Sequence, residues 1–464
     1  MTAEHTSEFV VVANRLPVDR HIEADGTESW RTSPGGLVTA LEPVMQDRSG
    51  SAWVGWHGAA DEELEPFVHE GMQLVPTPLS SDDVRDYYEG MSNATLWPLY
   101  HDGVAFPEYH REWWDSYLRV NRRFAEKAAA VAADGARVWV QDYQLQLVPK
   151  LLRQLRPDLR IGFFLHIPFP PMELFQQLPW RAEILDGLLG ADLVGFQVPG
   201  AAANLIHLVG ERLEYPTTEE SITLPDGHRC WTRAYPISIA TQKFADLAAT
   251  ASVQQRAAQI RTDLGDPTHL FLGVDRLDYT KGIKQRLRAF GELVESGDLD
   301  PDEVAFVQVA TPSRERVREY QVLRDEIERI VGRINGSVGR IGHPPITYLH
   351  SRYPREEMAA LYVAADVAVV SPLRDGMNLV AKEYVACRAD ETGALVLSEF
   401  AGAAKELQSA YLVNPYDING MKRALRQAVN DTDAERQRRM TTMRHQVFEY
   451  DIDRWADAFL RDMG

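Results

Sequence analysis

The segment Val274–Gly282 (VDRLDYTKG) places two cations, Arg276 and Lys281, five residues apart. Its apolar start is typical of a buried strand, and the residues that follow are typical of a turn into a helix. An arginine offers a fixed fork of donors and a lysine a compact charge, so the two together suit the oxygens of a diphosphate. Lysine is scarce, with 8 residues against 41 arginines, so Lys281 is more than compositional background. A surface pair flanking the start of a helix explains the spacing equally well.

A second segment, Pro372–Glu383 (PLRDGMNLVAKE), has the pattern of a strand end, a glycine turn and a helix. The free backbone N–H groups of such a turn can bind an anion. Asp375 and Glu383 stand eight residues apart, about two helical turns, so both could accept hydrogen bonds from sugar or ribose hydroxyls. The competing interpretation is that Asp375 caps the helix and Glu383 faces solvent.

The first half of the chain holds weaker signals of the same kind. Ser33–Leu37 (SPGGL) contains a glycine pair where backbone could approach a phosphate or sugar closely, although a plain turn is as good an interpretation. Five aromatic residues could stack on sugar rings: Trp53, Trp56, Tyr87, Tyr88 and Trp97. Core packing is the commoner use of such residues.

The elements that must position these residues alternate between short β-branched runs and longer stretches with helical spacing, which predicts an α/β fold with parallel sheets. The first set of predicted strands is Phe9–Asn14, Ala136–Gln141, Arg160–Leu165 and Asp192–Gln197. The second set is Leu270–Val274, Val304–Val309, Ile346–Tyr348, Asp366–Val370 and Ala394–Leu397. Polar residues follow strands of both sets: Asn14, Arg15, Asp142, Tyr143, His166, Arg276, Arg314, Arg374 and Asp375. One such residue is usually a cap or a loop charge, but so many favour ligand binding at the carboxyl ends of the strands.

The proline-marked stretch Tyr235–Thr241 (YPISIAT) separates the two sets of strands and predicts a domain boundary before the helical region Phe244–Leu264. We expect two doubly wound domains, residues 1–240 and 241–450, with the ligand crevice between them. Residues 451–464 are predicted to form a closing helix that packs back on the first domain.

The composition excludes several classes of protein. With 49 basic and 68 acidic residues, the formal charge of −19 opposes binding to a nucleic-acid backbone. Cys230 and Cys387 form no CxxC pair, which indicates a reducing compartment. The sequence shows no secretion signal and no apolar run long enough to span a bilayer. We therefore expect a cytoplasmic protein with no nucleic-acid or membrane partner.

Several enzyme motifs are also missing from the sequence. It contains no GxxxxGK[ST] loop, no GxGxxG after a strand, no HExxH and no GxSxG, which disfavours kinases, dehydrogenases, metalloproteases and serine hydrolases. No two histidines have metal-ligand spacing on a predicted helix. A metal-free enzyme acting on phosphorylated sugars is the simplest remaining class.

Seven strings resemble the trehalose-6-phosphate synthases, glycosyltransferase family 20, nearly from end to end: VVVANRLP (10–17), GGL (35–37), SNATLWP (92–98), RIGFFLHIPFP (160–170), VDRLDYTKG (274–282), RDGMNLVAKEY (374–384) and SEFAGAAKEL (398–407). The resemblance implies a GT-B fold of two Rossmann-like domains. It further implies transfer of glucose, with retention, from UDP-glucose or GDP-glucose to glucose-6-phosphate, giving α,α-trehalose 6-phosphate without a metal or cofactor.

The resemblance also assigns site residues. The acceptor site comprises Arg15, Trp56, Tyr88, Trp97, Asp142, Tyr143 and Arg314, with Arg15 and Arg314 on the phosphate. The donor site comprises Gly35, Gly36, His166, Arg276, Lys281, Arg352, Tyr353, Asp375, Gly376, Met377, Asn378, Leu379 and Glu383. The expected catalytic residues are Arg276, Lys281, His166 and Asp142. Of these, Arg276 and Lys281 would neutralise the departing diphosphate.

Two features leave details open. QDYQL (141–145) stands where the family often has HDYHL, and because glutamine cannot titrate, an acid–base role for these flanking positions is in doubt. Arg352 could read the O6 and N7 acceptors of guanine, or it could simply face solvent. The sequence does not decide whether the chain forms a homo-oligomer.

Three other functions compete with this one. The first is a pseudo-glycosyltransferase of the same fold that joins a nucleotide-cyclitol to an aminocyclitol phosphate. The second is a sugar-nucleotide epimerase, which is disfavoured because Arg15 and Arg314 provide for a second, phosphorylated ligand. The third is a non-catalytic sugar-phosphate sensor, which would be expected to lose some of the cationic residues.

Overall fold

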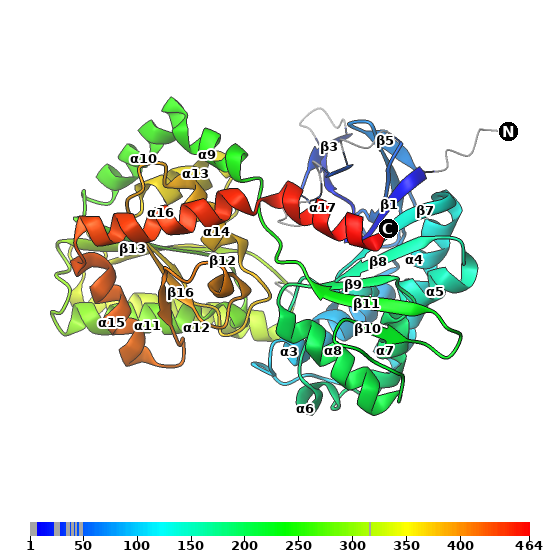
Figure 1. Cartoon of the computed structure of the whole chain (residues 1–464). Helices are drawn as coiled ribbons and strands as arrows, with labels where there is room; N and C mark the ends of the chain where they lie inside the picture. Colours follow the sequence, from blue (N-terminus) through cyan, green and yellow to red (C-terminus); the bar gives the residue numbers. More distant parts are fainter. Residues whose placement is uncertain are drawn as a thin grey trace. The chain divides into compact units, whose positions relative to one another are not determined.

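The chain divides into two compact units, which are seen in Figure 1: unit 1 comprises Met1–Ile237 and Asp453–Gly464, and unit 2 comprises Ser238–Ile452. The computed structural model describes residues 7–22, 28–33, 38, 41, 44–45, 50–314 and 317–464. Both units are α/β, as predicted, and each is built on a mainly or wholly parallel sheet.

Unit 1 carries a nine-stranded sheet and a separate hairpin. Its strands are β1 (Ser7–Arg15), β2 (Val18–Ile22), β3 (Glu28–Thr32), β4 (Ala52–Trp56), β5 (Phe67–His69), β6 (Met72–Pro76), β7 (Ala132–Gln141), β8 (Arg160–Phe164), β9 (Leu193–Phe196), β10 (Ser221–Thr223) and β11 (Arg229–Ala234). Its helices are α2 (Ser81–Asp83), η1 (Val84–Leu96), α3 (Trp97–Tyr100), α4 (Arg111–Val131), η2 (Tyr143–Leu145), α5 (Val148–Leu155), α6 (Met172–Phe175), α7 (Arg181–Leu188), α8 (Pro199–Arg212) and α17 (Ile452–Met463).

The order of this sheet is β10-β11-β9-β8-β7-β1-β4-β6-β5, and the seven strands from β11 to β6 are parallel. In chain order, β1 forms the starting strand, β4 and β6 are added on one side of it, and β7 and the following strands are added on the other side. The order in which strands are added therefore reverses between β1 and β7. In doubly wound sheets, ligands bind at the carboxyl ends of the strands beside such a reversal. Parallel strands are covered on both faces, which explains why β1 is an almost unbroken apolar run.

The predicted closing helix, α17, packs on the sheet of unit 1. The Phe459 ring stacks on Trp139 with 4.7 Å between ring centres, and Trp455 Nε1 donates a hydrogen bond to the Tyr235 carbonyl at 3.2 Å. A Cβ on Gly195 would come within 2.6 Å of the Phe459 ring. The absence of a side chain at this strand position therefore lets the helix lie close to the sheet.

Unit 2 carries a six-stranded parallel sheet. Its elements are α9 (Thr241–Ala249), α10 (Ala251–Asp263), β12 (His269–Arg276), η3 (Tyr279–Lys281), α11 (Ile283–Glu295), β13 (Val304–Thr311), α12 (Arg318–Val338), β14 (Ile346–Leu349), α13 (Arg355–Ala364), β15 (Val367–Val370), α14 (Leu379–Cys387), β16 (Ala394–Ser398), η4 (Gly402–Lys405), β17 (Tyr411–Val413), α15 (Ile418–Asn430) and α16 (Asp433–Glu449).

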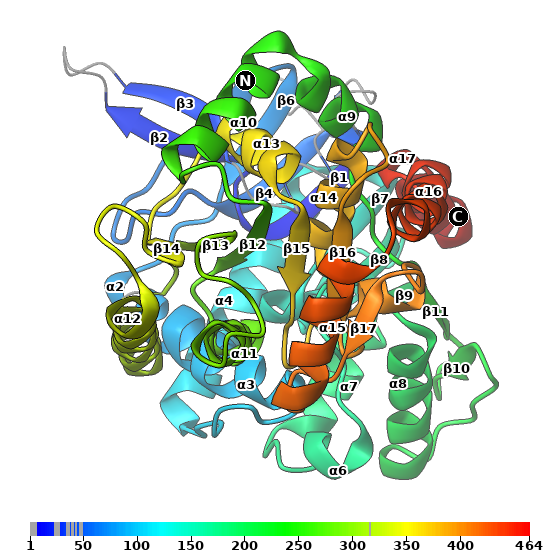
Figure 2. The same cartoon turned by 90° about the vertical axis from the view of Figure 1, so that its left-hand side faces the viewer.

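The order β14-β13-β12-β15-β16-β17 is the Rossmann order, with the reversal between β12 and β15. Figure 2 shows α11, α12 and α15 on one face of this sheet and α9, α10, α13, α14 and α16 on the other. A buried core joins the first group of helices to the strands through residues such as Phe290, Ile327 and Leu425. Of the residues that the sequence singled out, Arg276 ends β12 and Asp375 follows β15, so these two lie at the strands beside the reversal.

All nine predicted strands are confirmed to within a few residues. The helical region Phe244–Leu264 proves to be two helices, because Thr250 adopts an extended conformation with φ −65° and ψ 143°.

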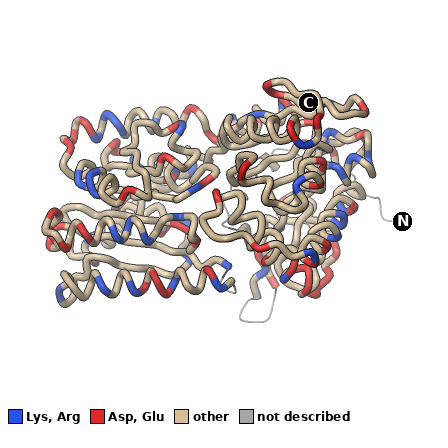
Figure 3. The backbone as a smooth tube through the Cα atoms, turned by 90° about the horizontal axis from the view of Figure 1, so that it is seen from below, with Lys and Arg blue, Asp and Glu red and all other residues tan. Residues whose placement is uncertain are grey.

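Among the described residues, no helix is both long and apolar enough to cross a membrane. Figure 3 shows acidic and basic residues interspersed along the helices of unit 2, where pairs such as Arg324 and Glu328 meet at 2.8 Å.

Replacing Phe459 with alanine is expected to destabilise unit 1 by about 3–5 kcal/mol, because a fully buried aromatic ring leaves a cavity behind. The measurement is the urea midpoint of the unfolding transition followed by tryptophan fluorescence. Phe106→Ala is the matched control, since the Phe106 side chain is 97% exposed and should leave the midpoint unchanged. Equal midpoints for Phe459→Ala and wild type would contradict the packing described for α17.

Candidate functional site

In unit 1, Arg15 ends β1 and Trp56 ends the neighbouring strand β4. The guanidinium carbon of Arg15 stands 5.0 Å from the centre of the Trp56 ring, and Arg15 Nη2 donates to Asp19 Oδ1 at 3.1 Å. Tyr88 lies edge-on to Trp56, with 5.9 Å between ring centres. Gly58 has a φ of +104°, which favours glycine, and a Cβ there would displace the Arg15 guanidinium, because it would come within 2.4 Å of Nη2. Three residues of the predicted acceptor site thus lie together.

The segment that carries Tyr88 is the π-helix η1, in which the Trp97 N–H bonds to the Ser92 carbonyl five residues earlier. π-Helical segments are rare and frequently mark functional sites. Trp97 lies beside Tyr143, with 5.6 Å between ring centres, and the Tyr143 hydroxyl donates to Asn93 Oδ1 at 2.8 Å. Two further residues of the predicted acceptor site, Trp97 and Tyr143, therefore lie side by side next to the end of η1.

Asp142 follows β7 with φ at +72°, a conformation that few non-glycine residues adopt. Its Oδ1 accepts a hydrogen bond from the His166 backbone N–H at 3.2 Å, which joins the carboxyl ends of β7 and β8. His166 Nε2 lies 2.9 Å from Gln141 Oε1, and burial lowers the pKa of His166 to about 3. The ring is therefore neutral at neutral pH. With Gln141 Oε1 as acceptor, the proton sits on Nε2 and Nδ1 is left as an acceptor.

In unit 2, Arg276 ends β12, and Lys281 lies in the turn η3 that follows. Lys281 Nζ forms an ion pair with Asp375 Oδ2 at 2.6 Å, and both side chains are mostly buried. Asp278, between the two cations in sequence, is fully buried. Burial alone would raise the pKa of its carboxyl, but the positive charges of Arg314, Arg276 and Lys281 lower the pKa to about 2. Three predicted site cations thus surround one ionised carboxylate.

A fully buried arginine, Arg286, joins the backbone segments that meet at this turn. Its Nη1 pairs with Asp275 Oδ2 at 2.7 Å and donates to the Val369 carbonyl at 2.9 Å. Its Nε donates to Ser371 Oγ at 3.0 Å, and its Nη2 donates to the Lys281 carbonyl. One side chain therefore ties the ends of β12 and β15 to the turn that carries Lys281.

The turn Asp375–Leu379 leads into α14, whose N-cap is Asn378 rather than Asp375. Asn378, with φ at +81°, accepts a hydrogen bond from the Ala381 N–H at 3.3 Å, and its Nδ2 donates to Asp375 Oδ2 at 3.2 Å. Glu383 is half-buried and accepts a hydrogen bond from the Tyr362 hydroxyl at 2.7 Å, and burial raises the pKa of Glu383. The interpretation of Asp375 as a cap and Glu383 as a solvent-facing residue is therefore wrong.

The turn Asp375–Leu379 also contacts η4 and its flanking residues, which belong to the string SEFAGAAKEL (398–407). Lys382, which is buried next to Glu383 on α14, pairs with Glu406 at 2.7 Å. A Cβ on Gly402 would lie 2.0 Å from the Gly376 carbonyl oxygen, so only a glycine permits this approach of the two backbones. The Gly376 and Met377 backbone is held in this way at the end of β15.

Arg314 and the pair Arg352 and Tyr353 have contrasting surroundings. Arg314 has φ at +49°, its side chain is 6% exposed, and its guanidinium lies over the Tyr320 ring at 5.5 Å. Arg352 is exposed and Tyr353 half-buried in the loop after β14. The exposure of Arg352 agrees with a solvent-facing arginine and leaves base recognition a prediction.

Some expectations lie outside these contacts. Gly35 and Gly36 fall outside the described residues, so the glycine pair stays a prediction. Within the described ranges, no group of three or more His, Cys, Asp or Glu side chains could hold a metal ion. Trp53 and Tyr87 are fully buried, as ordinary core residues would be.

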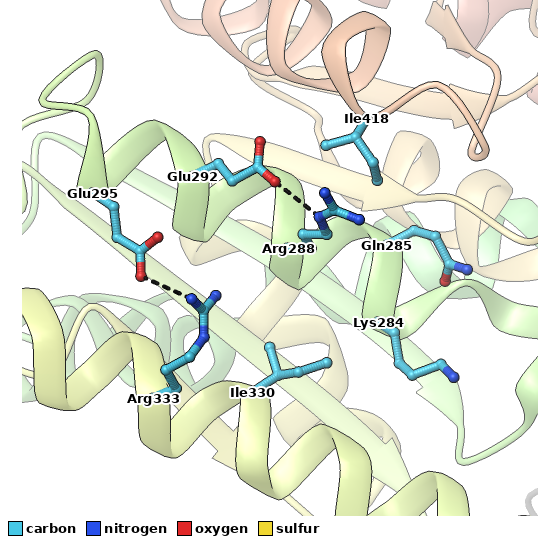
Figure 4. A pocket seen from close by; sticks show the side chains of 8 residues that line it. All are labelled: Lys284, Gln285, Arg288, Glu292, Glu295, Ile330, Arg333 and Ile418. Carbon is cyan, nitrogen blue, oxygen red and sulfur yellow. Dashed lines mark hydrogen bonds and ion pairs between the residues drawn. The ribbon is translucent and has the colours of Figure 1, made fainter.

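An open pocket of about 470 Å³ on unit 2 contains none of the predicted site residues. Figure 4 shows that its charged side chains largely satisfy one another, because Arg288 pairs with Glu292 at 2.8 Å and Arg333 with Glu295 at 3.6 Å. The lining residues are Lys284, Gln285, Arg288, Glu292, Glu295, Ile330, Arg333 and Ile418. The predicted site residues lie at the carboxyl ends of the strands and not in this pocket, so the candidate site is placed at the strand ends.

Sequence reasoning missed the residues that support the site from beneath. Asp278 stands inside VDRLDYTKG, so its position between two cations was an available signal. Arg286, Tyr320 and the partner pair Lys382 and Glu406 gave no such signal, because their contacts join positions far apart in sequence.

Comparisons with known proteins agree with these features. The family model described as glycosyltransferase family 20 matches residues 7–464. The trehalose-6-phosphate synthase of Mycolicibacterium smegmatis is 59% identical over 467 aligned positions, which cover 99% of this chain and 93% of that protein.

Two solved structures are similar over nearly their whole length. One is an α,α-trehalose-phosphate synthase (UDP-forming) from Burkholderia xenovorans in complex with glucose-6-phosphate, with a TM-score of 0.89 and 35% identity, covering 98% of this chain and 99% of that one. The other, from E. coli and bound with UDP-2-fluoro glucose, has a TM-score of 0.89 and 35% identity and covers 98% of each chain.

Replacing Arg286 with methionine is expected to destabilise unit 2 by roughly 3–5 kcal/mol, because the buried Asp275 carboxylate would lose its counter-ion. The urea midpoint of unfolding measures the effect. Arg288→Met on the same helix is the control, since Arg288 is 62% exposed in its pair with Glu292 and such pairs contribute about 0–1 kcal/mol. If both variants shifted the midpoint equally, Arg286 would not organise the turn.

Proposed function

Because the chain belongs to glycosyltransferase family 20, we propose that it transfers glucose from a nucleotide-glucose to glucose-6-phosphate with retention and forms α,α-trehalose 6-phosphate. The observation that carries this proposal is the cationic turn of unit 2, where Arg276 and Lys281 lie beside the reversal between β12 and β15. The solved relatives described with glucose-6-phosphate and with a UDP-glucose analogue support the choice of substrates.

The donor diphosphate is proposed to bind Arg276 and Lys281. Negative charge grows on the diphosphate as the glycosidic bond breaks, and preorganised cations stabilise that charge. The ion pair with Asp375 holds Lys281 Nζ in one place. Backbone groups of the Asp375–Leu379 turn would contact the glucose or the diphosphate, and Glu383 would accept hydrogen bonds from the ribose.

The acceptor is proposed to bind the aromatic cluster of unit 1. Trp56, Tyr88 and Trp97 would contact the sugar, and Arg15 and Arg314 the phosphate. Asp142 and Tyr143 would face the acceptor hydroxyls. The contacts of Arg15 with Trp56 and of Tyr143 with Trp97 support the grouping of the unit 1 residues, because they place the Trp56 and Trp97 rings beside residues at the carboxyl ends of β1 and β7.

His166 is proposed to bind substrate as a neutral ring. Its lowered pKa, about 3, keeps the imidazole unprotonated at neutral pH, so it would act as a hydrogen-bonding group and would not deliver a proton as imidazolium. Arg276 and Lys281 are proposed to supply most of the stabilisation of the leaving diphosphate, and no divalent ion is part of the proposal.

UDP-glucose is the proposed donor, with GDP-glucose as the competitor, and the proposed location is the cytoplasm. The solved relatives described as UDP-forming and as bound with UDP-2-fluoro glucose support uridine as the base. The free, buried thiols of Cys230 and Cys387 are suited to a reducing compartment.

The test is a coupled assay of nucleoside diphosphate release, with UDP-, GDP- and ADP-glucose each offered with and without glucose-6-phosphate. Release that requires glucose-6-phosphate and persists in EDTA is expected. Inhibition by EDTA that Mg²⁺ or Mn²⁺ reverses would contradict the metal-free mechanism. Turnover only with an aminocyclitol phosphate would favour the pseudo-glycosyltransferase, and binding without release would favour a sensor.

Lys281→Ala is expected to lower kcat by on the order of 100- to 1000-fold, because one group that opposes the growing diphosphate charge is lost. Steady-state kinetics at saturating substrates measure this. Lys284→Ala, three residues further on, removes a lysine that is 40% exposed and paired with Glu326, so it should retain wild-type kcat. An unchanged kcat in Lys281→Ala would remove this residue from the mechanism.

A further inference from the structure

Asp278 divides its two carboxylate oxygens between two sets of partners. Oδ1 accepts hydrogen bonds from the Thr280 backbone N–H at 3.0 Å and from Thr280 Oγ1 at 2.9 Å. Oδ2 accepts a hydrogen bond from the Tyr320 hydroxyl at 3.1 Å and lies 3.6 Å from Arg314 Nη1. One oxygen therefore holds the turn that carries Lys281, and the other holds the surroundings of Arg314.

The Tyr320 hydroxyl relays the contact between the carboxylate and the arginine. It donates to Asp278 Oδ2 and accepts a hydrogen bond from Arg314 Nη1, while the Arg314 guanidinium lies over its ring. Tyr320 is 1% exposed, and burial keeps its pKa well above the usual range, so the hydroxyl stays protonated. These contacts hold Arg314 even though its φ of +49° is unfavourable for a non-glycine residue.

The charges explain why one carboxylate serves both groups. Arg276, Lys281 and Arg314 all act on Asp278, and each would repel the others if no anion lay between them. Asp278 is buried and its pKa is lowered to about 2, so a negative charge lies among the three cations before any substrate binds.

We propose that Asp278 and Tyr320 are positioning residues that join the donor-binding turn of unit 2 to Arg314, which unit 2 contributes to the acceptor site. These two parts are called the half-sites below: Asp278 sets the turn through Thr280 and Arg314 through Tyr320. This inference rests on the proposed function, which gives Arg314 the acceptor phosphate. It follows that the two half-sites can be disturbed separately by removing one hydroxyl at a time.

The experiment compares Tyr320→Phe with Thr280→Val. Tyr320→Phe is expected to raise the KM for glucose-6-phosphate by on the order of tenfold, and to lower the preference for glucose-6-phosphate over glucose by a similar factor. The KM for the nucleotide-glucose and the Kd for UDP, measured by calorimetry, should not change. Thr280→Val is expected to weaken UDP binding and the donor KM while leaving the preference for the phosphorylated acceptor intact.

Tyr411→Phe is the matched control. It breaks another hydrogen bond between a tyrosine and an aspartate, Tyr411 to Asp431 at 2.8 Å, on the far edge strand β17, so both KM values should stay at wild type. Asp278→Asn is expected to impair both half-sites. If that variant fails to fold, the two hydroxyl variants still decide the question.

Two results would overturn the proposal: an unchanged KM for glucose-6-phosphate in Tyr320→Phe, or equal rises of both KM values in Tyr320→Phe and Thr280→Val. Wild-type turnover tests the proposed function separately. A wild-type chain that released no nucleoside diphosphate with glucose-6-phosphate would refute that function, and with it the role of Arg314. Normal wild-type turnover combined with either overturning result would refute the positioning role alone.

Discussion

Cations that bind phosphates repel one another until the substrate arrives, and the fold must hold them together without it. In unit 2 this is achieved with three aspartates: Asp375 pairs with Lys281, Asp275 with the buried Arg286, and Asp278 lies among the remaining cations. A buried charge without a partner is costly, so each carboxylate also fixes the position of its cation. The same contacts therefore balance the charges of this region and place the side chains that are proposed to bind substrate.

The backbone brings these groups together by the same device in both units. Each sheet reverses its strand order beside its first strand, and several predicted site residues follow strands that flank the reversal, among them Arg15 and Asp142 in unit 1 and Arg276 and Asp375 in unit 2. Positive φ values recur after strands of both sheets, at Asp142, Arg314 and Asn378. Strained residues persist only where their surroundings hold them, and hydrogen bonds or ion pairs are seen at each of the three.

Much of this could be read from the sequence, for a physical reason. Parallel strands are buried on both faces, so β1, β12 and β15 contain continuous apolar runs that can be recognised in the sequence. The polar residue after each run marks the end of the strand. The buried side chains that hold the site residues in place could not be identified in this way. Arg286 contacts Ser371 across 85 positions, and Tyr320 contacts Asp278 across 42, so the partners of these side chains are known only once the chain is folded. The π-helix η1 was not predicted from the sequence either, because its residue spacing fits neither the 3.6-residue period of an α-helix nor the two-residue period of a strand.

The central claim, that glucose is transferred with retention to glucose-6-phosphate, is tested most directly by ¹³C NMR of the product formed from UDP-glucose labelled at the anomeric carbon. The account predicts a single labelled disaccharide phosphate in which the labelled carbon is α-linked to the anomeric oxygen of unlabelled glucose-6-phosphate. A β-linked product, or free labelled glucose as the only product, would contradict it.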